Sequence, residues 1–293
     1  MAGHAVMPRV PFIKMQGAGN DYVFIDGFVT PCPESAAELA VQVSDRHRGI
    51  GSDGLIMMVP PDDKTCDVEM RMWNADGSEG QMCGNGVRCV ALWMALQQRV
   101  TGACRVRTKS RTVAVDVLEL QRNGLRGRFR ADMGCPEFSV ESGDRLEYLN
   151  DVRLPGVEDA NVGVVAVSMG NPHAVVFADE LTDRNVRHAG RIIECHPRFP
   201  GGTNVEWVRV VSETKLHVRV WERGSGETQA CGSGACAAAV AAIDQGYCAR
   251  GEPIQVDLPG GRLEVEWQKS GTLWLAGPAA VSFTGEWVSR ADD

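Results

Sequence analysis

Hydrophobic and polar residues alternate over many short stretches of the chain, which is the pattern of strands buried on one face. Two apolar stretches rich in small residues follow positions 83 and 231, and each is long enough for a helix. A further helix is predicted over residues 34–46. Strands are predicted over residues 10–13, 23–26, 55–59, 67–73, 112–120, 163–168, 174–177, 204–211, 217–221, 254–258, 262–267 and 272–276. Few helices among many mainly antiparallel strands predict an α+β fold.

The two apolar helices follow the same short motif. Cys83 opens a Cys-Gly-Asn-Gly segment and Cys231 opens a Cys-Gly-Ser-Gly segment, about half the chain apart. Each cysteine is preceded by an alternating strand that ends in Trp73 or Trp221 and by a polar loop containing glycine. Because solenoid repeats recur every roughly 20–50 residues, this longer period indicates a duplicated domain.

A cysteine at the start of a helix has a recognisable chemistry. The first turn carries unpaired N–H groups and a partial positive charge, so it stabilises a thiolate and lowers the thiol pKa from about 8.5. The glycines after each cysteine let backbone N–H groups approach a carboxylate or phosphate. One such motif alone is more often structural. Two related by a pseudo-twofold axis would face each other, so that one thiolate could remove a proton from one face of a carbon while the other thiol protonates the opposite face.

The other cysteines and the lysines argue against a cofactor or a metal. Cys83 and Cys89, and Cys231 and Cys236, are too far apart for the two-to-four-residue spacing of zinc ligands. We therefore interpret Cys89 and Cys236 as helix packing. None of the five lysines lies beside a glycine-rich phosphate loop, which favours a route without pyridoxal phosphate. Ten cysteines are too few for a disulfide scaffold, and we expect small buried thiols at Cys32, Cys66, Cys104, Cys135, Cys195 and Cys248.

Charge and hydropathy limit the partners. The chain has 30 basic and 38 acidic residues and a net charge of -8, so it lacks the positive surface of a general nucleic-acid binder. The one basic stretch, residues 122–130, is interpreted as a solvated strand edge. No apolar run reaches the roughly 18 residues of a membrane-spanning helix, and no signal peptide is recognisable. We expect a cytoplasmic protein that binds neither nucleic acid nor membrane.

Seven segments, in order, resemble the diaminopimelate epimerases, and the resemblance covers nearly the whole chain. These segments are KMQGAGNDY (14–22), DRHRGIGSDG (45–54), WNADGSE (73–79), MCGNGVRC (82–89), GNPH (170–173), GTNV (202–205) and ERGSGETQACGSGAC (222–236). Residues 1–6 match nothing in the family. Gly54 also departs from the family members that carry glutamine at that position, so we leave it out of the site.

The resemblance implies two pseudo-symmetric domains, each a mixed, mainly antiparallel sheet wrapped around a central helix, with the active site in the interdomain cleft. The first domain would comprise residues 1–128 and a C-terminal return over 277–293, and the second residues 129–276. The implied activity is a cofactor-independent epimerisation between LL- and meso-2,6-diaminoheptanedioate, on the way to lysine and peptidoglycan precursors. The implied partner is this small molecule, and a homodimer is compatible with the family.

The family pattern also assigns the site residue by residue. Cys83 and Cys231 would be the acid and base, and His173 and Glu222 would tune or orient their thiols; whether His173 transfers a proton or only positions a thiol stays open. The first helical turns would hold the reacting carboxylate at Gly84, Asn85, Gly232 and Ser233. The distal ammonium and carboxylate would be bound by neutral amides, one guanidinium and one carboxylate, which satisfy these charges when they are buried; these groups belong to Asn20, Asn74, Asn171, Asn204, Glu222 and Arg223.

Two alternatives remain at this stage. Another cofactor-free cysteine-pair racemase, acting on proline or hydroxyproline, would not need Asn74, Asn204 or the Glu222–Arg223 pair. A redox protein could instead join Cys83 and Cys231 in a reversible disulfide, since low-pKa thiolates oxidise readily.

Overall fold

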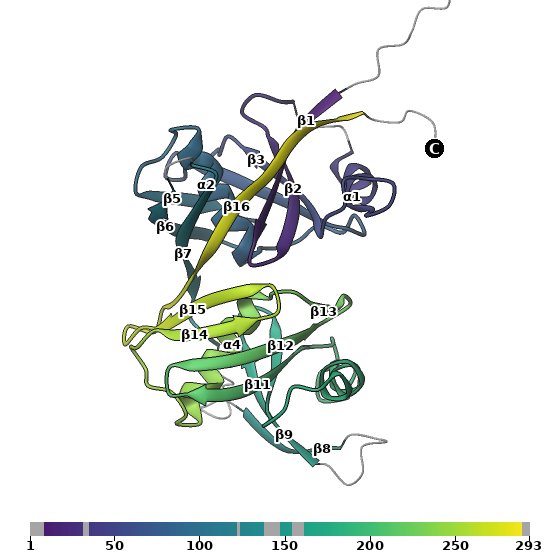
Figure 1. The fold of residues 1–293 in the computed structure, drawn as a ribbon, viewed down its shortest axis with the longest axis vertical. Helices are drawn as coiled ribbons and strands as arrows, with labels where there is room; N and C mark the ends of the chain where they lie inside the picture. Colours follow the sequence, from purple (N-terminus) through teal and green to yellow (C-terminus); the bar gives the residue numbers. More distant parts are fainter. Residues whose placement is uncertain (1–8, 32–34, 122–123, 138–146, 154–160, 289–293) are drawn as a thin grey trace, which may run out of the picture. The chain divides into compact units, whose positions relative to one another are not determined.

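The computed structural model describes residues 9–31, 35–121, 124–137, 147–153 and 161–288. The chain divides into two compact units: the first comprises Met1–Gly17, Asp21–Phe129 and Ala279–Asp293, and the second Ala18–Asn20 and Arg130–Pro278. Figure 1 shows each unit as a sheet with one long helix, α2 or α4. Residues 1–6, Cys32, the first residue of the helix expected over 34–46 and residues 122–123 of the basic stretch lie outside the described residues.

The first unit is a ring of strands around α2. Strands β1 to β7 are neighbours in chain order, and β16 closes the ring by pairing with both β7 and β1. The β2–β3 and β4–β5 pairs are parallel, whereas β1–β16, β3–β4 and β5–β6 are antiparallel. The elements are β1 (Arg9–Gly17), β2 (Asn20–Asp26), α1 (Ala36–Ser44), β3 (Gly54–Val59), β4 (Val68–Asn74), α2 (Gly84–Leu96), β5 (Ala103–Arg107), β6 (Thr112–Leu120), β7 (Arg126–Gly134) and the end of β16 (Leu273–Val288).

The second unit has the same order of elements around α4. Its strands are neighbours in the order β16, β15, β14, β12, β11, β10, β9 and β8, with β13 beside β12. The β10–β11 and β12–β14 pairs are parallel and the remaining pairs of β8 to β15 are antiparallel. The elements are β8 (Glu147–Arg153), β9 (Asn161–Ser168), β10 (Pro172–Phe177), the π-helix η1 (Arg184–Ala189), α3 (Gly190–Glu194), β11 (Asn204–Ser212), β12 (Lys215–Glu222), β13 (Gly226–Thr228), α4 (Gly232–Asp244), β14 (Ile254–Leu258) and β15 (Gly261–Trp267).

The predicted α+β fold with a duplicated, sheet-rich domain is therefore confirmed. In both units a pair of neighbouring strands is followed by a short helical segment, a parallel strand, an antiparallel strand and then the central helix, with β13 added before α4 in the second unit. The two central helices each have 13 residues and a cysteine as N-cap. Both helices are buried over most of their length, as expected for helices that are apolar on all sides.

Several elements differ from the sequence expectation for identifiable reasons. Strand β5 was not predicted, because the arginines at its exposed positions mask the alternation of buried Cys104 and Val106. Strand β16 continues to Val288 instead of ending at Ala276, although Gly277 and Pro278 are typical of a strand end.

The cysteines outside the two helix motifs were expected to be buried. This expectation is wrong for Cys135 and Cys195, which are exposed. No disulfide joins the nine cysteines that the structure describes. No helix in the described part of the chain is long and apolar enough to cross a membrane.

Helix α4 packs against the surrounding strands mainly through alanine side chains. The side chains from Ala237 to Ala242 are all fully buried, and α4 contacts β9, β10, β11, β12, β14 and β15. Small side chains let strands approach the helix closely on every side, so the unit depends on their size.

We expect Ala239→Leu to lower the free energy of unfolding by about 1–3 kcal/mol, because the added carbons have no free volume around them. Val41→Leu, on the exposed side of α1, should change it by less than about 0.5 kcal/mol. Urea unfolding midpoints of the two variants and the unaltered protein measure this difference. Equal midpoints would contradict tight packing around α4.

Candidate active site

Cys83 and Cys231 occupy equivalent positions as N-caps of the central helices. The backbone of both residues is extended, which turns each Sγ towards the first helical turn. Cys83 Sγ accepts a hydrogen bond from Gly86 N at 3.3 Å, and Cys231 Sγ accepts one from Gly234 N at 3.4 Å. The two sulfur atoms therefore take the place that serine, threonine or aspartate oxygens occupy at most N-caps.

The second glycine of each motif lies close to a side chain of the strand beneath it. A Cβ added at Gly86 would lie 2.7 Å from Ile56 Cδ1, and a Cβ added at Gly234 would lie 2.7 Å from Glu206 Oε1. Such distances are shorter than a van der Waals contact, so a larger residue would have to displace the end of the Ile56 or Glu206 side chain. The Cys-Gly-x-Gly pattern thus reflects a close approach of the first turn to β3 in one unit and β11 in the other.

The surroundings of Cys231 disfavour its thiolate. Burial raises the pKa of the Cys231 thiol well above its ordinary value, and the carboxylates of Glu222 and Glu206 raise it further. Hydrogen bonds from Ser233 and Gly234 lower the pKa but do not offset these effects. The expectation that a helix start lowers the cysteine pKa is therefore wrong for Cys231, because the burial of the thiol is not visible in the sequence.

A buried histidine–glutamate pair lies beside this helix start. His173 Nδ1 is 2.7 Å from Glu206 Oε1, and both side chains are fully enclosed. His173 Nε2 lies 3.1 Å from Asn171 Oδ1, so both ring nitrogens are engaged. Glu206 was not among the residues singled out from the sequence. Its signal is an acidic residue within an otherwise apolar strand segment, Val205 to Val208, that is buried on both faces.

Other expected substrate-binding residues of the second unit are linked by hydrogen bonds. Asn204 Oδ1 accepts from the Arg223 backbone N–H at 2.9 Å, and Asn204 Nδ2 donates to the Pro172 carbonyl at 3.2 Å. The Thr228 hydroxyl donates to Glu222 Oε1. Cys231 Sγ lies 3.5 Å from Ser233 Oγ. The contacts of Asn204 link the starts of β10 and β11 to the residue after β12, whereas the Cys231–Ser233 contact lies within the start of α4.

The expected residues of the first unit lie at the end of β4 and the start of α2. Asn74 Nδ2 donates to Ser78 Oγ at 2.9 Å, which fixes the side chain against the loop after β4. The Asn85 side chain is buried and accepts from Arg88 at 2.7 Å, so its backbone N–H is the group best suited to a ligand. Asn20, the first residue of β2, belongs by its contacts to the second unit.

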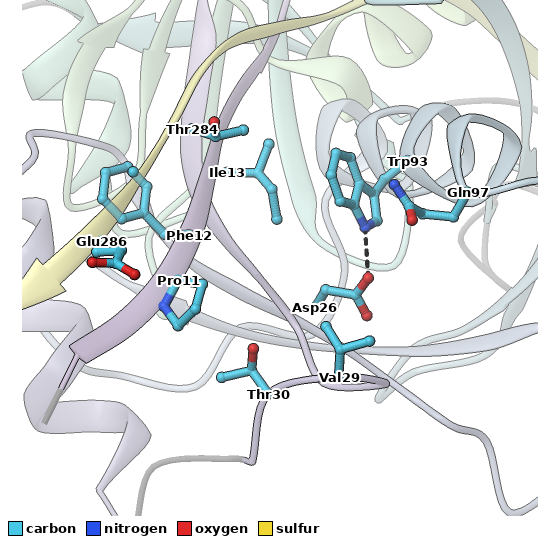
Figure 2. A pocket seen from close by; sticks show the side chains of 11 residues that line it. Pro11, Phe12, Ile13, Asp26, Val29, Thr30, Trp93, Gln97, Thr284 and Glu286 are labelled. Carbon is cyan, nitrogen blue, oxygen red and sulfur yellow. Dashed lines mark hydrogen bonds between the residues drawn. The ribbon is translucent and has the colours of Figure 1, made fainter.

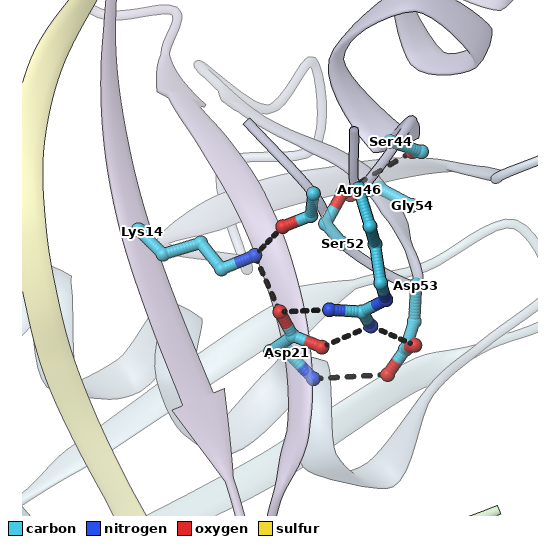
Figure 3. Close-up of polar contacts among 8 residues, drawn as sticks. Lys14, Asp21, Ser44, Arg46, Ser52, Asp53 and Gly54 are labelled. Atoms are coloured by element: carbon cyan, nitrogen blue, oxygen red, sulfur yellow. Dashed lines mark hydrogen bonds and ion pairs between the residues drawn. The ribbon is translucent and has the colours of Figure 1, made fainter. Parts of the chain in front are cut away.

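A charged network supports the loop that leads into β3 (Figure 3). Buried Lys14 binds Asp21 and the Gly51 carbonyl, and Arg46 binds Asp21 at 2.8 Å and Asp53 at 2.9 Å. Burial alone would raise the pKa of Asp21, but hydrogen bonds from Arg46 and Lys14 outweigh it and hold that pKa below its ordinary value. The network fixes the backbone directly after Asn20.

A separate cavity of about 420 Å³ lies in the first unit (Figure 2). Its polar wall includes Asp26, which accepts hydrogen bonds from Trp93 Nε1 at 2.9 Å and from Arg99 at 3.0 Å. None of the expected site residues lines this cavity. Among the described residues, no three histidine, cysteine, aspartate or glutamate side chains are grouped so as to hold a metal ion.

Comparison with known proteins shows the family to which the chain belongs. The family model described as diaminopimelate epimerase matches residues 12–138 and 165–281. The chain belongs to the diaminopimelate epimerase family. It is 43% identical over 286 residues to the diaminopimelate epimerase of Desulfovibrio desulfuricans, covering 94% of this chain and 97% of that protein. It is 42% identical over 284 residues to the diaminopimelate epimerase of Oceanobacillus iheyensis, covering 94% and 97%.

Solved structures of more distant proteins share the fold. A hydroxyproline epimerase from Agrobacterium vitis has a TM-score of 0.68 at 13% identity, with 97% of this chain and 92% of that chain covered. A PhzF-family phenazine biosynthesis protein from Bacillus anthracis has a TM-score of 0.68 at 14% identity, covering 97% and 100%. At such low identity the similarity shows a shared fold, and it does not indicate which substrate this chain binds.

We expect Asp21→Asn to lower the free energy of unfolding at pH 7 by about 2–3 kcal/mol, somewhat less than the loss for a fully buried pair, because Lys14 stays buried without its anion. The folded-state pKa of Asp21 is depressed, so its contribution is complete above its unfolded pKa of about 3.8 and is lost as the pH falls through the folded value. Denaturant unfolding from pH 7 to pH 2 should show the two curves converging only below about pH 4.

Glu286→Gln is the matched control, because Glu286 pairs with Arg9 where both side chains are exposed. This variant should lose less than about 1 kcal/mol. An Asp21→Asn effect no larger than that of Glu286→Gln would contradict the supporting role of the network.

Proposed function

We propose that this chain is a cofactor-independent epimerase that interconverts LL- and meso-2,6-diaminoheptanedioate. The observation that carries the proposal is the pair of cysteine N-caps, one at the start of the buried central helix of each unit. Relatives named diaminopimelate epimerase match over nearly the full length of the chain. The proposed substrate is therefore a free amino acid, and neither nucleic acid nor membrane enters the reaction.

The proposed reaction exchanges one proton for another at the α-carbon. A thiolate at one cysteine takes the α-proton, so a C–H bond breaks and an S–H bond forms. The electron pair left on carbon spreads into the adjoining carboxylate, and the thiol of the other cysteine donates its proton to the opposite face. The reverse reaction exchanges the two roles. Cys83 and Cys231 act as this pair in the proposal.

The first helical turns would stabilise the intermediate. Backbone N–H groups at Gly84, Asn85, Gly232 and Ser233 lie in the first helical turns, where N–H groups can bind the carboxylate on which negative charge develops. His173 and Glu222 would tune or orient the thiols: Glu222 acts electrostatically on Cys231, and His173 is joined to Glu206 beneath the same helix turn. We assign His173 to positioning, because both of its ring nitrogens already have protein partners.

The end of the substrate that is not inverted would set specificity. Its ammonium and carboxylate need partners of both signs, which Glu222 and Arg223 supply together with the side-chain amides of Asn20, Asn74, Asn171 and Asn204. The hydrogen bonds between Asn204, Arg223 and Pro172 support this assignment, because they fix these groups before any ligand binds. A place in lysine and peptidoglycan precursor synthesis follows from the substrate. The cytoplasmic location and a homodimer remain predictions.

Epimerisation in D₂O tests the reaction. The reduced protein should convert LL-diaminopimelate to the meso isomer with incorporation of deuterium at the inverted α-carbon. Cys83→Ala and Cys231→Ala should each lower the epimerisation rate by about 10²–10⁴-fold, which is the contribution of a positioned group that transfers a proton. Mass spectrometry and chiral chromatography follow exchange and inversion separately.

Cys195→Ala, which removes an exposed thiol of the second unit, serves as the control and should retain full activity. Deuterium exchange that persists in one cysteine variant would assign that variant's remaining cysteine to one face of the substrate. A protein that neither exchanges nor inverts diaminopimelate, and instead racemises proline, would overturn the proposal.

The distal contacts should reject truncated substrates. We expect kcat/KM for 2-aminoheptanedioate, which lacks the distal ammonium, to be about 10⁴-fold below that for diaminopimelate, because buried polar groups would be left without partners. Steady-state kinetics with both compounds measure the ratio. A ratio below about tenfold would exclude a distal site built from these residues.

A further inference from the structure

The duplicated units allow residues around the two cysteines to be compared position by position. Gly54 in β3 pairs with Asn74, the last residue of β4. In the second unit Val205 pairs with Trp221, which places Asn204 opposite Glu222, the last residue of β12. Ile56 and Glu206 are therefore equivalent residues, each the third residue of its strand. Both lie directly beneath the second glycine of the helix motif, Gly86 or Gly234.

The two helices also differ in charge at one equivalent position, where the first unit has the charged residue and the second the neutral one. Arg88 and Cys236 are each the fifth residue of their helix and are both fully buried. The Arg88 guanidinium donates to the Gly84 carbonyl at 3.1 Å and to Asn85 Oδ1 at 2.7 Å, within the first turn of α2. The start of α2 thus has a buried cation within the helix and an aliphatic side chain beneath it. The start of α4 has a buried carboxylate beneath it and a neutral thiol within the helix.

These differences act on the cysteines through the helix start. The N-terminus of a helix favours one negative charge near its unpaired N–H groups. In α4 a carboxylate already lies beside this place, because a Cβ added at Gly234 would meet Glu206 Oε1 at 2.7 Å and Cys231 Sγ at 3.3 Å. A thiolate at Cys231 would be a second anion in the same low-dielectric turn, and like charges at such separation disfavour each other.

The His173 ring anchors the Glu206 carboxylate. Glu206 Oε1 is bound by His173 Nδ1, whereas Oε2 is buried with no hydrogen-bond partner among the described residues. The orientation of the carboxylate therefore depends on the histidine, and Asn171 holds the other ring nitrogen. The groups whose charge acts on Cys231 are Glu206 from β11 and Glu222 from β12, with His173 of β10 coupled to them through Glu206.

We propose that Glu206 is a positioning residue that, together with the burial of the thiol and with Glu222, keeps Cys231 protonated in the ligand-free protein and fixes the His173 ring beside it. Cys83, which has Ile56 in place of a carboxylate and Arg88 in its helix, is then the cysteine that ionises first. For the epimerase, and resting on the function proposed above, this makes Cys83 the resting base and Cys231 the resting acid. The isomer whose proton meets Cys83 would bind the major form of the enzyme directly.

The test measures how readily each cysteine is alkylated as a function of pH, since only the thiolate reacts. The protein without ligand is treated with iodoacetamide from pH 5 to pH 11, and peptides containing Cys83 and Cys231 are quantified by mass spectrometry; a profile still rising at pH 11 counts as a midpoint above it. The pH midpoint of each profile reports ionisation and does not depend on how accessible the sulfur is. In the unaltered protein the Cys83 midpoint should lie at least one pH unit below that of Cys231.

Glu206→Gln keeps the shape of the side chain and removes its charge. It should move the Cys231 midpoint to lower pH and raise its alkylation rate at pH 7 about tenfold, with the Cys83 midpoint unchanged. Glu206→Asp, which restores the charge, should return the midpoint towards its original value. Glu213→Gln removes an equivalent charge from the exposed turn between β11 and β12 and should leave both midpoints unchanged.

The outcomes separate this inference from the proposed function. A Cys231 midpoint at or below that of Cys83 in the unaltered protein would overturn the inference without any variant being made. An unchanged Cys231 midpoint in a folded Glu206→Gln protein would do the same. Because alkylation needs no substrate, a failure to epimerise diaminopimelate would remove the proposed function and leave the order of ionisation standing.

Discussion

The structure depends on the need to satisfy the N-terminus of a buried helix. Each unit buries one long apolar helix within a sheet, and the N–H groups of the first helical turn therefore cannot all turn to bulk water. In both units a cysteine sulfur takes one of these N–H groups, and sulfur is a weaker acceptor than the oxygens usually found there. The first-turn N–H groups also form the kind of site that binds an anion. An anionic ligand completes the cap, so the same feature that limits stability creates affinity for a carboxylate.

The two units repeat one backbone arrangement around a cysteine and differ in the charges that surround it. The two units repeat the same strand pairings, the same helix length and the same cysteine cap. What differs is the charge at matched positions: Ile56 against Glu206, Arg88 against Cys236 and Asn74 against Glu222. A strictly symmetric pair of thiols would have no preferred resting state. Substitutions at three matched positions bias one helix start towards an anion and the other against it.

The sequence alone predicts the architecture well because its signals are local. Alternation predicts most strands, and the Cys-Gly-x-Gly motifs predict both helix starts. Strand β5 is missed because arginines follow its buried cysteine and valine, and the full length of β16 is missed because Gly277 and Pro278 are typical of a strand end. The site is less predictable, because a pKa depends on burial and on neighbours distant in sequence. Of the causes that oppose the ionisation of Cys231, the sequence indicated Glu222 but revealed neither the desolvation of the thiol nor the Glu206 charge.

Glu206 also shows how a costly residue can be recognised as a functional one. A buried carboxylate with one oxygen lacking a hydrogen-bond partner is unfavourable compared with an apolar residue of similar size. The first unit shows that the fold does not need it, because Ile56 fills the same position beneath the same glycine. The position of Glu206 also restricts residue 234, since a Cβ there would have to displace its carboxylate. A residue that lowers stability, constrains its neighbour and has a neutral equivalent in the same chain is better explained by its effect on Cys231 and His173 than by packing.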